Sequence, residues 1–374
     1  MAAAAGLTGW ISSRRARLDG HGREPGVDLA RGLAVIGMFA AHLLDTSALV
    51  WDDPETWTDV VNGRSSILFA TLAGVSLALL TGGARPADGA RLREARIRIA
   101  VRAVWVWALG MLLVQLQTPV LVILPAYAIL FLLALPALRL RAPWLFALAA
   151  FVAVTMPFPV FAINGWSGWG APGGEELAHA LGWHYPFLLW IAFVLAGLAV
   201  GRMSFSRPLT AGLLLVAGIV LAGIGYGVVG RWGALALADS LWGGALSGAA
   251  HSSGVGEALG SGGFAIAVIA LCALLCATPA RWLVLPLRAV GAMPLTAYTA
   301  QLVAWALLQP APQPWGPDIE AFRATEPFWP FTIATIVGCT LWSLFVGRGP
   351  LEWAMMATAR LAARPFAATT RRDR

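Results

Sequence analysis

Long apolar stretches alternate with short polar segments along the chain, from about residue 27 to residue 346. A stretch of roughly 18 apolar residues, at about 1.5 Å of rise per residue, crosses a hydrocarbon core of about 30 Å. We place about ten such spans, at 27–49, 65–82, 99–116, 120–138, 143–163, 186–201, 208–229, 262–279, 289–309 and 328–346. The pattern predicts an all-α, polytopic transmembrane helix bundle.

Composition narrows the function classes. The chain is 59% hydrophobic and 12% charged, whereas soluble domains are roughly 25% charged. A net charge of +7 would suggest nucleic acid in a soluble protein, but the arginines here gather in alternate connections between spans. We therefore expect the lipid bilayer, and no nucleic acid, as a partner. The cysteines lie within apolar stretches, so we expect no disulfide framework and no metal site.

The distribution of arginine predicts the orientation. With a cytoplasmic N-terminus, 22 of the 26 basic residues fall on the cytoplasmic side, and most acidic residues fall on the other. This positive-inside bias places both termini in the cytoplasm and the chain in the inner (plasma) membrane as a multi-pass protein. Residues 1–26 then form a basic cytoplasmic segment, 27–346 the bundle, and 347–374 a basic cytoplasmic tail.

The first span carries three polar residues in the run DLARGLAVIGMFAAH, namely Asp28, Arg31 and His42. A charge at the centre of a span costs about 2.5 to 3.5 kcal/mol. Eleven steps of 100° leave Arg31 and His42 about 20° apart in azimuth and ~16 Å apart along the helix. Asp28 and Arg31 can pair at the i, i+3 spacing. These residues form either a chemical centre at two depths, with an imidazole suited to proton transfer, or an interfacial ion pair and a snorkelling histidine.

The pattern Asp28-x-x-Arg31-Gly32 followed by His42 resembles the first-helix motif of the type 3 membrane acyltransferases. The wider chain is similar to bacterial relatives of heparan-alpha-glucosaminide N-acetyltransferase that carry a C-terminal domain of unknown function. The supporting stretches are GRSSILFATLAGVSLAL at 63–79, YPFLLWIAFVLAGLAVGR at 185–202, VGAMPLTAYTAQ at 290–301 and GPLEW at 349–353. The resemblance divides the bundle into an acyltransferase-like part, 27–229, and a C-terminal part, 230–346.

This resemblance implies a catalytic set of His42, Asp28 and Arg31. The lysosomal enzyme places its catalytic histidine in the outer loop after its first helix, and residues 46–63 contain none here. His42 must then replace it, unless His184 or His251 serves. Candidate substrate-binding residues are His251, in the long polar loop 230–261, and two polar groups within a span, Tyr298 and Gln301.

Four arginines at the start of the third span, Arg93, Arg96, Arg98 and Arg102, are candidates for holding the phosphates of a nucleotide-bearing acyl donor. The cluster resembles the Arg-rich start of the third helix in the acyltransferases. Anchoring by the positive-inside rule accounts for it equally well.

The function implied is an integral membrane acyltransferase. It would move an acyl group, most simply acetyl, from cytosolic acyl-CoA to an extracytoplasmic glycan or lipid acceptor of the cell envelope. His42 would act as general base or form a transient acyl-histidine. Two alternatives stay open: a multi-pass transporter or exporter with Asp28, Arg31 and His42 as a relay, and a packing or signalling subunit. The halves show no repeat of the kind common in transporters, which favours the enzyme. The oligomeric state stays open, a homodimer included.

Overall fold

The structure is a computed structural model that describes residues 23–46, 49, 52–240, 242–309 and 319–372. Within these ranges the chain is helical and has no β-strand, which confirms the all-α prediction. Most of the predicted basic segment 1–26 lies outside the described residues.

Seven helical segments of the described chain are long and apolar enough to cross a membrane. They are α2 (Pro25–Leu43), η1 with α3 (Pro54–Val61 and Arg64–Leu80), α4 (Gly89–Val114), α6 with α7 (Ala142–Thr155 and Pro157–Asn164), α10 with η4 and α11 (Pro208–Gly223, Ile224–Gly233 and Ala234–Ala236), α12 (Val255–Cys276) and α16 (Phe328–Phe345). The pair α13 (Leu285–Ala292) and α14 (Pro294–Leu308) qualifies as an eighth if it is counted as one span.

The predicted count of about ten is not confirmed. Two of the predicted spans, 120–138 and 186–201, contain the shorter apolar helices α5 (Leu124–Ala134) and α9 (Phe187–Arg202). The long helix α17 (Pro350–Arg372) ends the described chain. The remaining described elements are short: η2 (Pro136–Arg139), η3 (Ser167–Gly170), α8 (Gly174–Leu181), η5 (Gly244–Leu246), η6 (Pro279–Trp282) and α15 (Ile319–Arg323).

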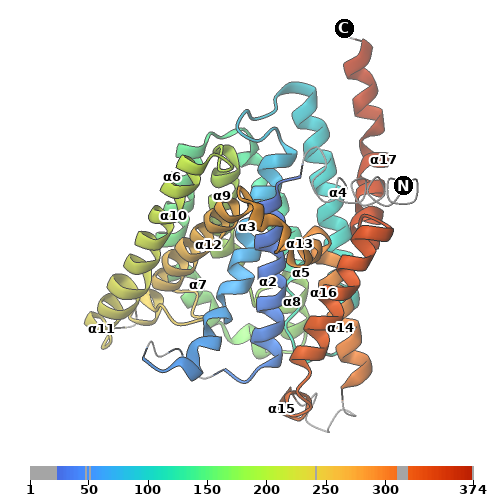
Figure 1. The fold of residues 1–374 in the computed structure, drawn as a ribbon. Helices are drawn as coiled ribbons and strands as arrows, with labels where there is room; N and C mark the ends of the chain where they lie inside the picture. Colours follow the sequence, from blue (N-terminus) through green and yellow to red (C-terminus); the bar gives the residue numbers. More distant parts are fainter. Residues whose placement is uncertain (1–22, 47–48, 50–51, 241, 310–318, 373–374) are drawn as a thin grey trace.

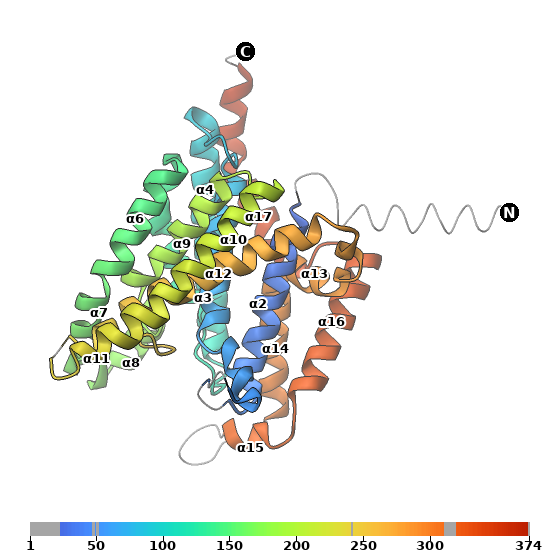
Figure 2. The same cartoon turned by 60° about the vertical axis from the view of Figure 1, so that its left-hand side comes forward.

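Helix α2 lies at the centre of the bundle (Figures 1 and 2), where it packs against α3, α12, α13, α14 and α16. Its contact with α13 brings two backbones together at Gly32 and Gly291. A Cβ atom on Gly32 would lie 2.1 Å from the carbonyl oxygen of Leu287, and one on Gly291 would lie 1.7 Å from that of Asp28. Only glycine fits either position.

The break between α13 and α14 bends the chain by 84°. Pro294 has no N–H group and begins α14, as proline commonly does at the first helical position. Glu352, at the start of α17, accepts hydrogen bonds from the backbone N–H groups of Leu295 at 2.7 Å and Thr296 at 3.0 Å. The glutamate of the GPLEW stretch therefore satisfies two of the free N–H groups that a helix leaves at its start.

The two ends of the bundle differ in shape. Helices α4 and α17 pack together and project beyond the bundle at the end where α2 begins (Figure 1). We call this the Asp28 end, and the opposite end, where α2 finishes beside η1 and α15, the His42 end.

Candidate functional site

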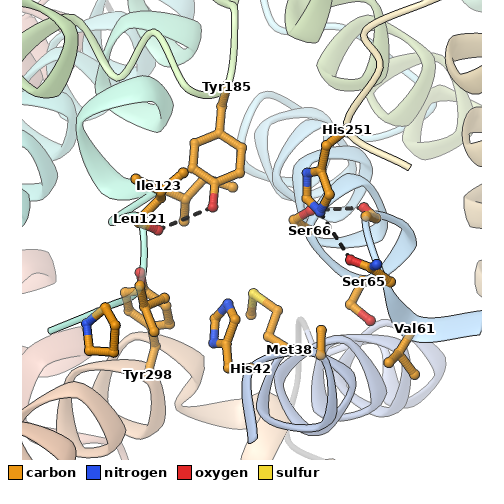
Figure 3. A pocket seen from close by; sticks show the side chains of 15 residues that line it. Met38, His42, Val61, Ser65, Ser66, Leu121, Ile123, Tyr185, His251 and Tyr298 are labelled. Atoms are coloured by element: carbon orange, nitrogen blue, oxygen red, sulfur yellow. Dashed lines mark hydrogen bonds between the residues drawn. The ribbon is translucent and has the colours of Figure 1, made fainter. Parts of the chain in front are cut away.

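A cavity of about 210 Å³ opens at the His42 end. Its wall is built from α2, the turn between η1 and α3, the segment before α5, the residues before α9, the loop before α12, and α14. The polar residues that line it are His42, Asn62, Ser65, Ser66, Tyr185, His251 and Tyr298. Figure 3 shows the imidazoles of His42 and His251 pointing into this space from different walls. We call it the His42 cavity.

Three residues singled out in the sequence thus meet in one place. His42 comes from the first helix, His251 from the loop before α12, and Tyr298 from α14. Gln301, in contrast, is 2% exposed and lines a groove between α14 and α16, away from the His42 cavity. His184 packs its ring 5.2 Å from that of His179 and does not line the His42 cavity.

His42 is held from two sides. Arg323 of α15 donates from Nε to the backbone oxygen of His42 at 3.0 Å, which fixes the last turn of α2. The imidazole lies 6.3 Å from the ring of Trp305. Its Nδ1 is buried and has no hydrogen-bond partner among the described residues.

His251 sits on a tightly held loop. Its backbone N–H donates to Oε1 of Glu257 at 2.7 Å, and that of Ser253 donates to Oε2 at 2.7 Å. Both donors have left-handed φ angles, 62° and 55°, which non-glycine residues rarely adopt. The buried carboxylate, 5% exposed, therefore holds the loop in a conformation that it would not keep alone.

The side chain of His251 is also oriented. Its Nε2 lies 3.1 Å from Oδ1 of Asn62, and Nδ2 of Asn62 donates to Oδ1 of Asp59 at 3.1 Å. Desolvation by the surrounding protein lowers the pKa of His251 below its ordinary value, and the negative charge of Asp59 opposes this shift. Asn62 precedes Gly63, whose φ of 68° makes the turn into α3.

A second cavity, of about 350 Å³, lies at the Asp28 end and is lined by Arg23, Glu24, Asp28, Arg31, Ser76 and Arg102 together with apolar residues. Asp28 is 4% exposed. It pairs with Arg23 at 2.9 Å and with Arg31 at 3.1 Å, so the predicted i, i+3 ion pair is present. Arg31 also donates to Oγ of Ser76 on α3 at 2.6 Å. We call this the Asp28 cavity.

The four candidate phosphate-binding arginines do not line one common cavity. Arg102 lines the Asp28 cavity with Arg31. Arg98, one turn away, lines a separate hollow of about 580 Å³ and pairs with Glu94. Arg93 is exposed, and Arg96 is six residues from Arg102, which turns it away from the face that Arg98 and Arg102 share.

The two cavities share no lining residue. Between them α2 presents Val35 and Phe39, both fully buried.

Residues of both cavities were predicted from the sequence, Asp28 with Arg31 in one and His42 in the other, but Asp59, Asn62 and Tyr185 were missed. The run Asn62-Gly63-Arg64-Ser65-Ser66 was the available signal, since polar side chains gathered at the start of an apolar span need partners.

Two known family models match parts of this chain. Residues 23–227 match the family model described as heparan-alpha-glucosaminide N-acetyltransferase, catalytic. Residues 244–361 match a second family model, described as protein of unknown function (DUF418). A search of curated proteins finds no match. Among the described residues, no group of three or more His, Cys, Asp and Glu is arranged to hold a metal ion. Since the first match covers more than half of the 374 residues, the chain belongs to the heparan-alpha-glucosaminide N-acetyltransferase catalytic family and carries a C-terminal DUF418 region.

Proposed function

We propose that this membrane acetyltransferase-like protein moves an acyl group, most simply acetyl, from cytosolic acyl-CoA to a hydroxyl or amine of an extracytoplasmic glycan or lipid. The observation that carries the proposal is the His42 cavity, where two imidazoles and two phenols line one space in a chain of this family. Residues of both matched regions build it, because His251 and Tyr298 come from the DUF418 region. Both regions are thus needed for one site.

The lining of the cavity suits acyl transfer. Its lining contains no Asp, Glu, Lys or Arg side chain. A neutral imidazole is therefore the strongest base available to an acceptor placed there. An imidazole takes a proton from the acceptor while the acceptor atom attacks the thioester carbonyl, and such general-base assistance contributes about 10²- to 10⁴-fold. The hydroxyls of Tyr185 and Tyr298 are candidates for contacting the acceptor.

The Asp28 end fits a cytosolic donor. Arg23, Arg31 and Arg102 surround the Asp28 cavity, and guanidinium groups bind phosphates through several hydrogen bonds at once. Helices α4 and α17 project at the same end and carry many of the arginines that the positive-inside rule assigns to the cytoplasm. We therefore propose that the Asp28 end lies in the cytoplasm and that the His42 end lies on the outer side of the inner membrane, facing the cell-envelope acceptor.

Acetyl transfer by the purified protein tests the proposal. The protein in lipid vesicles would be given radiolabelled acetyl-CoA and a mixture of envelope glycans and lipids, and both CoA release and labelled product would be measured. We expect the double variant His42→Ala with His251→Ala, which removes both imidazoles of the cavity, to lower the rate by about 100-fold, and His184→Ala, outside the cavity, to leave it within about twofold. Equal rates for the wild-type protein and the double variant would overturn the proposal.

A transporter is the second candidate, favoured by the separation of the two cavities along α2 and by the broken pair α13 and α14. Transporters commonly place such broken helices beside their binding sites. The same vesicles distinguish the two functions: accumulation of an unmodified glycan or lipid precursor without acyl-CoA would support transport, and acyl-CoA-dependent labelling of the acceptor would support the enzyme.

A further inference from the structure

Asp59, Asn62 and His251 form a chain of hydrogen bonds whose direction is fixed by chemistry. Oδ1 of Asp59 lies 3.1 Å from one terminal atom of Asn62, and the other terminal atom of Asn62 lies 3.1 Å from Nε2 of His251. An ionised carboxylate only accepts hydrogen bonds, so the amide NH₂ of Asn62 must face Asp59. Asp59 is itself anchored, because its Oδ2 accepts from the backbone N–H of Leu49 at 3.3 Å.

The proton on His251 follows from this direction. With the NH₂ group turned toward Asp59, the carbonyl oxygen of Asn62 faces Nε2 of His251. That oxygen only accepts, so Nε2 must carry the hydrogen, and in the neutral ring Nδ1 then holds the lone pair. Figure 3 shows the ring of His251 pointing into the His42 cavity.

We infer that His251 is the general base of the acyl transfer, acting through Nδ1, and that Asn62 and Asp59 are positioning residues that fix its tautomer. The inference rests on the proposed function and names the base within that site. The base is supplied by the DUF418 region, while its two positioning residues belong to the catalytic-family region.

His42 lacks such a chain. Its Nδ1 is buried and has no hydrogen-bond partner among the described residues, and its ring packs beside Trp305. Within the described part of the chain, no hydrogen bond joins its ring to a carboxylate, directly or through an amide, so nothing there selects its tautomer. His42 is therefore assigned to contact the acceptor or the acyl group, and His251 to move the proton.

Charges around His251 support this assignment. Asp59 on η1 opposes the lowering of its pKa by desolvation, because its negative charge stabilises the protonated ring that forms when His251 accepts a proton. Glu257 on α12 is engaged with backbone N–H groups of the loop. His42 on α2 faces the same cavity, and Arg64 on α3 donates to the hydroxyl of Tyr226 at 2.8 Å.

The reaction balances with an acyl thioester as the second substrate. Nδ1 of His251 accepts the proton of the acceptor hydroxyl or amine while the acceptor oxygen or nitrogen bonds to the thioester carbonyl carbon. The carbon–sulfur bond then breaks, and the protonated imidazole returns its proton to the departing thiolate. The products are the acylated acceptor and free thiol, and His251 regains its starting form.

Nitrogen-15 NMR of the full-length protein tests the tautomer without any need for activity. The five histidines would be labelled at both ring nitrogens in lipid nanodiscs, and His251 assigned from its missing signals in His251→Gln. We expect Nε2 to be protonated and Nδ1 bare in the wild-type protein, and this preference to be lost in Asn62→Ala. Asn164→Ala, which removes the other asparagine, should leave it unchanged. A proton on Nδ1, or a preference that survives Asn62→Ala, would overturn the inference.

The pH profile of kcat/KM adds a catalytic readout. Asp59 raises the pKa of His251, so in Asp59→Asn the acid limb should move to lower pH while the maximal rate falls. Asp239→Asn changes an exposed aspartate in the same way and is the matched control. The acid limb of its pH profile should stay where it is in the wild-type protein.

Removal of the proposed base gives a second readout. In His251→Gln, kcat/KM should fall by about 10²- to 10⁴-fold. An active wild-type protein with an active His251→Gln variant would refute the role of His251. A wild-type protein inactive towards every acceptor would refute the proposed function. The NMR experiment would still show which ring nitrogen of His251 carries the hydrogen.

Discussion

At the scale of single residues, Asp28 shows how this chain keeps a charge inside a span. Its carboxylate is 4% exposed and receives hydrogen bonds from Arg23 and Arg31. Arg31 in turn donates to Ser76, so the pair joins α2 to α3. A buried charge is tolerated when its partners remain, and removal of one partner leaves the others uncompensated.

Asp28→Ala should therefore destabilise the protein by about 3 kcal/mol, the low end for a broken buried pair, because both arginines keep about a quarter of their side-chain surface exposed. Thermal unfolding in detergent measures the change. Glu175→Ala removes a carboxylate whose side chain is 82% exposed and should shift the midpoint little. An Asp28→Ala midpoint equal to that of Glu175→Ala would contradict this account.

The sequence predicts the local part of the site and not its assembly. The pairing of Asp28 with Arg31 follows from helix geometry alone, since residues three apart are neighbours. The meeting of His42 with His251 does not, because 209 positions separate them and only the packing of α2, α12 and α14 brings them together. Asn62 was missed for the same reason: its partner lies in the DUF418 region.

At the scale of elements, hydropathy locates the helices but not their breaks. The predicted span 289–309 contains α13 and α14, which meet at 84°. Pro294 marks where the second helix begins, but the angle depends on tertiary contacts. These are Glu352 at the start of α14 and the close approach of α13 to α2 at Gly32 and Gly291. Neither contact has a local signal in the sequence.

The contact of α13 with α2 makes a sharp prediction. Gly291→Ala places a methyl group 1.7 Å from the backbone oxygen of Asp28, so the helices must separate, at a cost of about 1–3 kcal/mol for overpacking. Gly212→Ala on α10 is the matched control, because no atom lies within 4 Å of its added Cβ. Unfolding midpoints of the two variants in detergent give the comparison. A tolerated Gly291→Ala would mean that α13 does not pack this closely.

At the scale of the whole molecule, the fold class follows from composition and periodicity, but the number of spans does not. Helices of 11 and 16 residues, α5 and α9, fall short of the roughly 20 that cross a bilayer unaided. Both pack inside the bundle, against each other and against neighbours such as α4 and α6. Protein around such helices, rather than lipid, decides their length.

The orientation is testable with engineered cysteines, since Cys272, Cys276 and Cys339 are buried. Glu175→Cys, at the start of α8, should react with a membrane-impermeant maleimide in intact cells. Arg364→Cys, exposed on α17, should react only after permeabilisation, because the positive-inside bias places α17 in the cytoplasm. Labelling in the reverse order would show that the bundle sits the other way round.

The fully buried stretch of α2 between the two cavities, marked by Val35 and Phe39, has a consequence for the energetics of the cell. A continuous wet path from Arg31 to His42 would conduct protons and collapse the gradient across the membrane. Because this stretch is fully buried, an acyl thioester entering from the cytosol, as proposed, would have to displace packed side chains to reach His251, and these would have to close behind it. The same segment would thus serve as an electrical insulator.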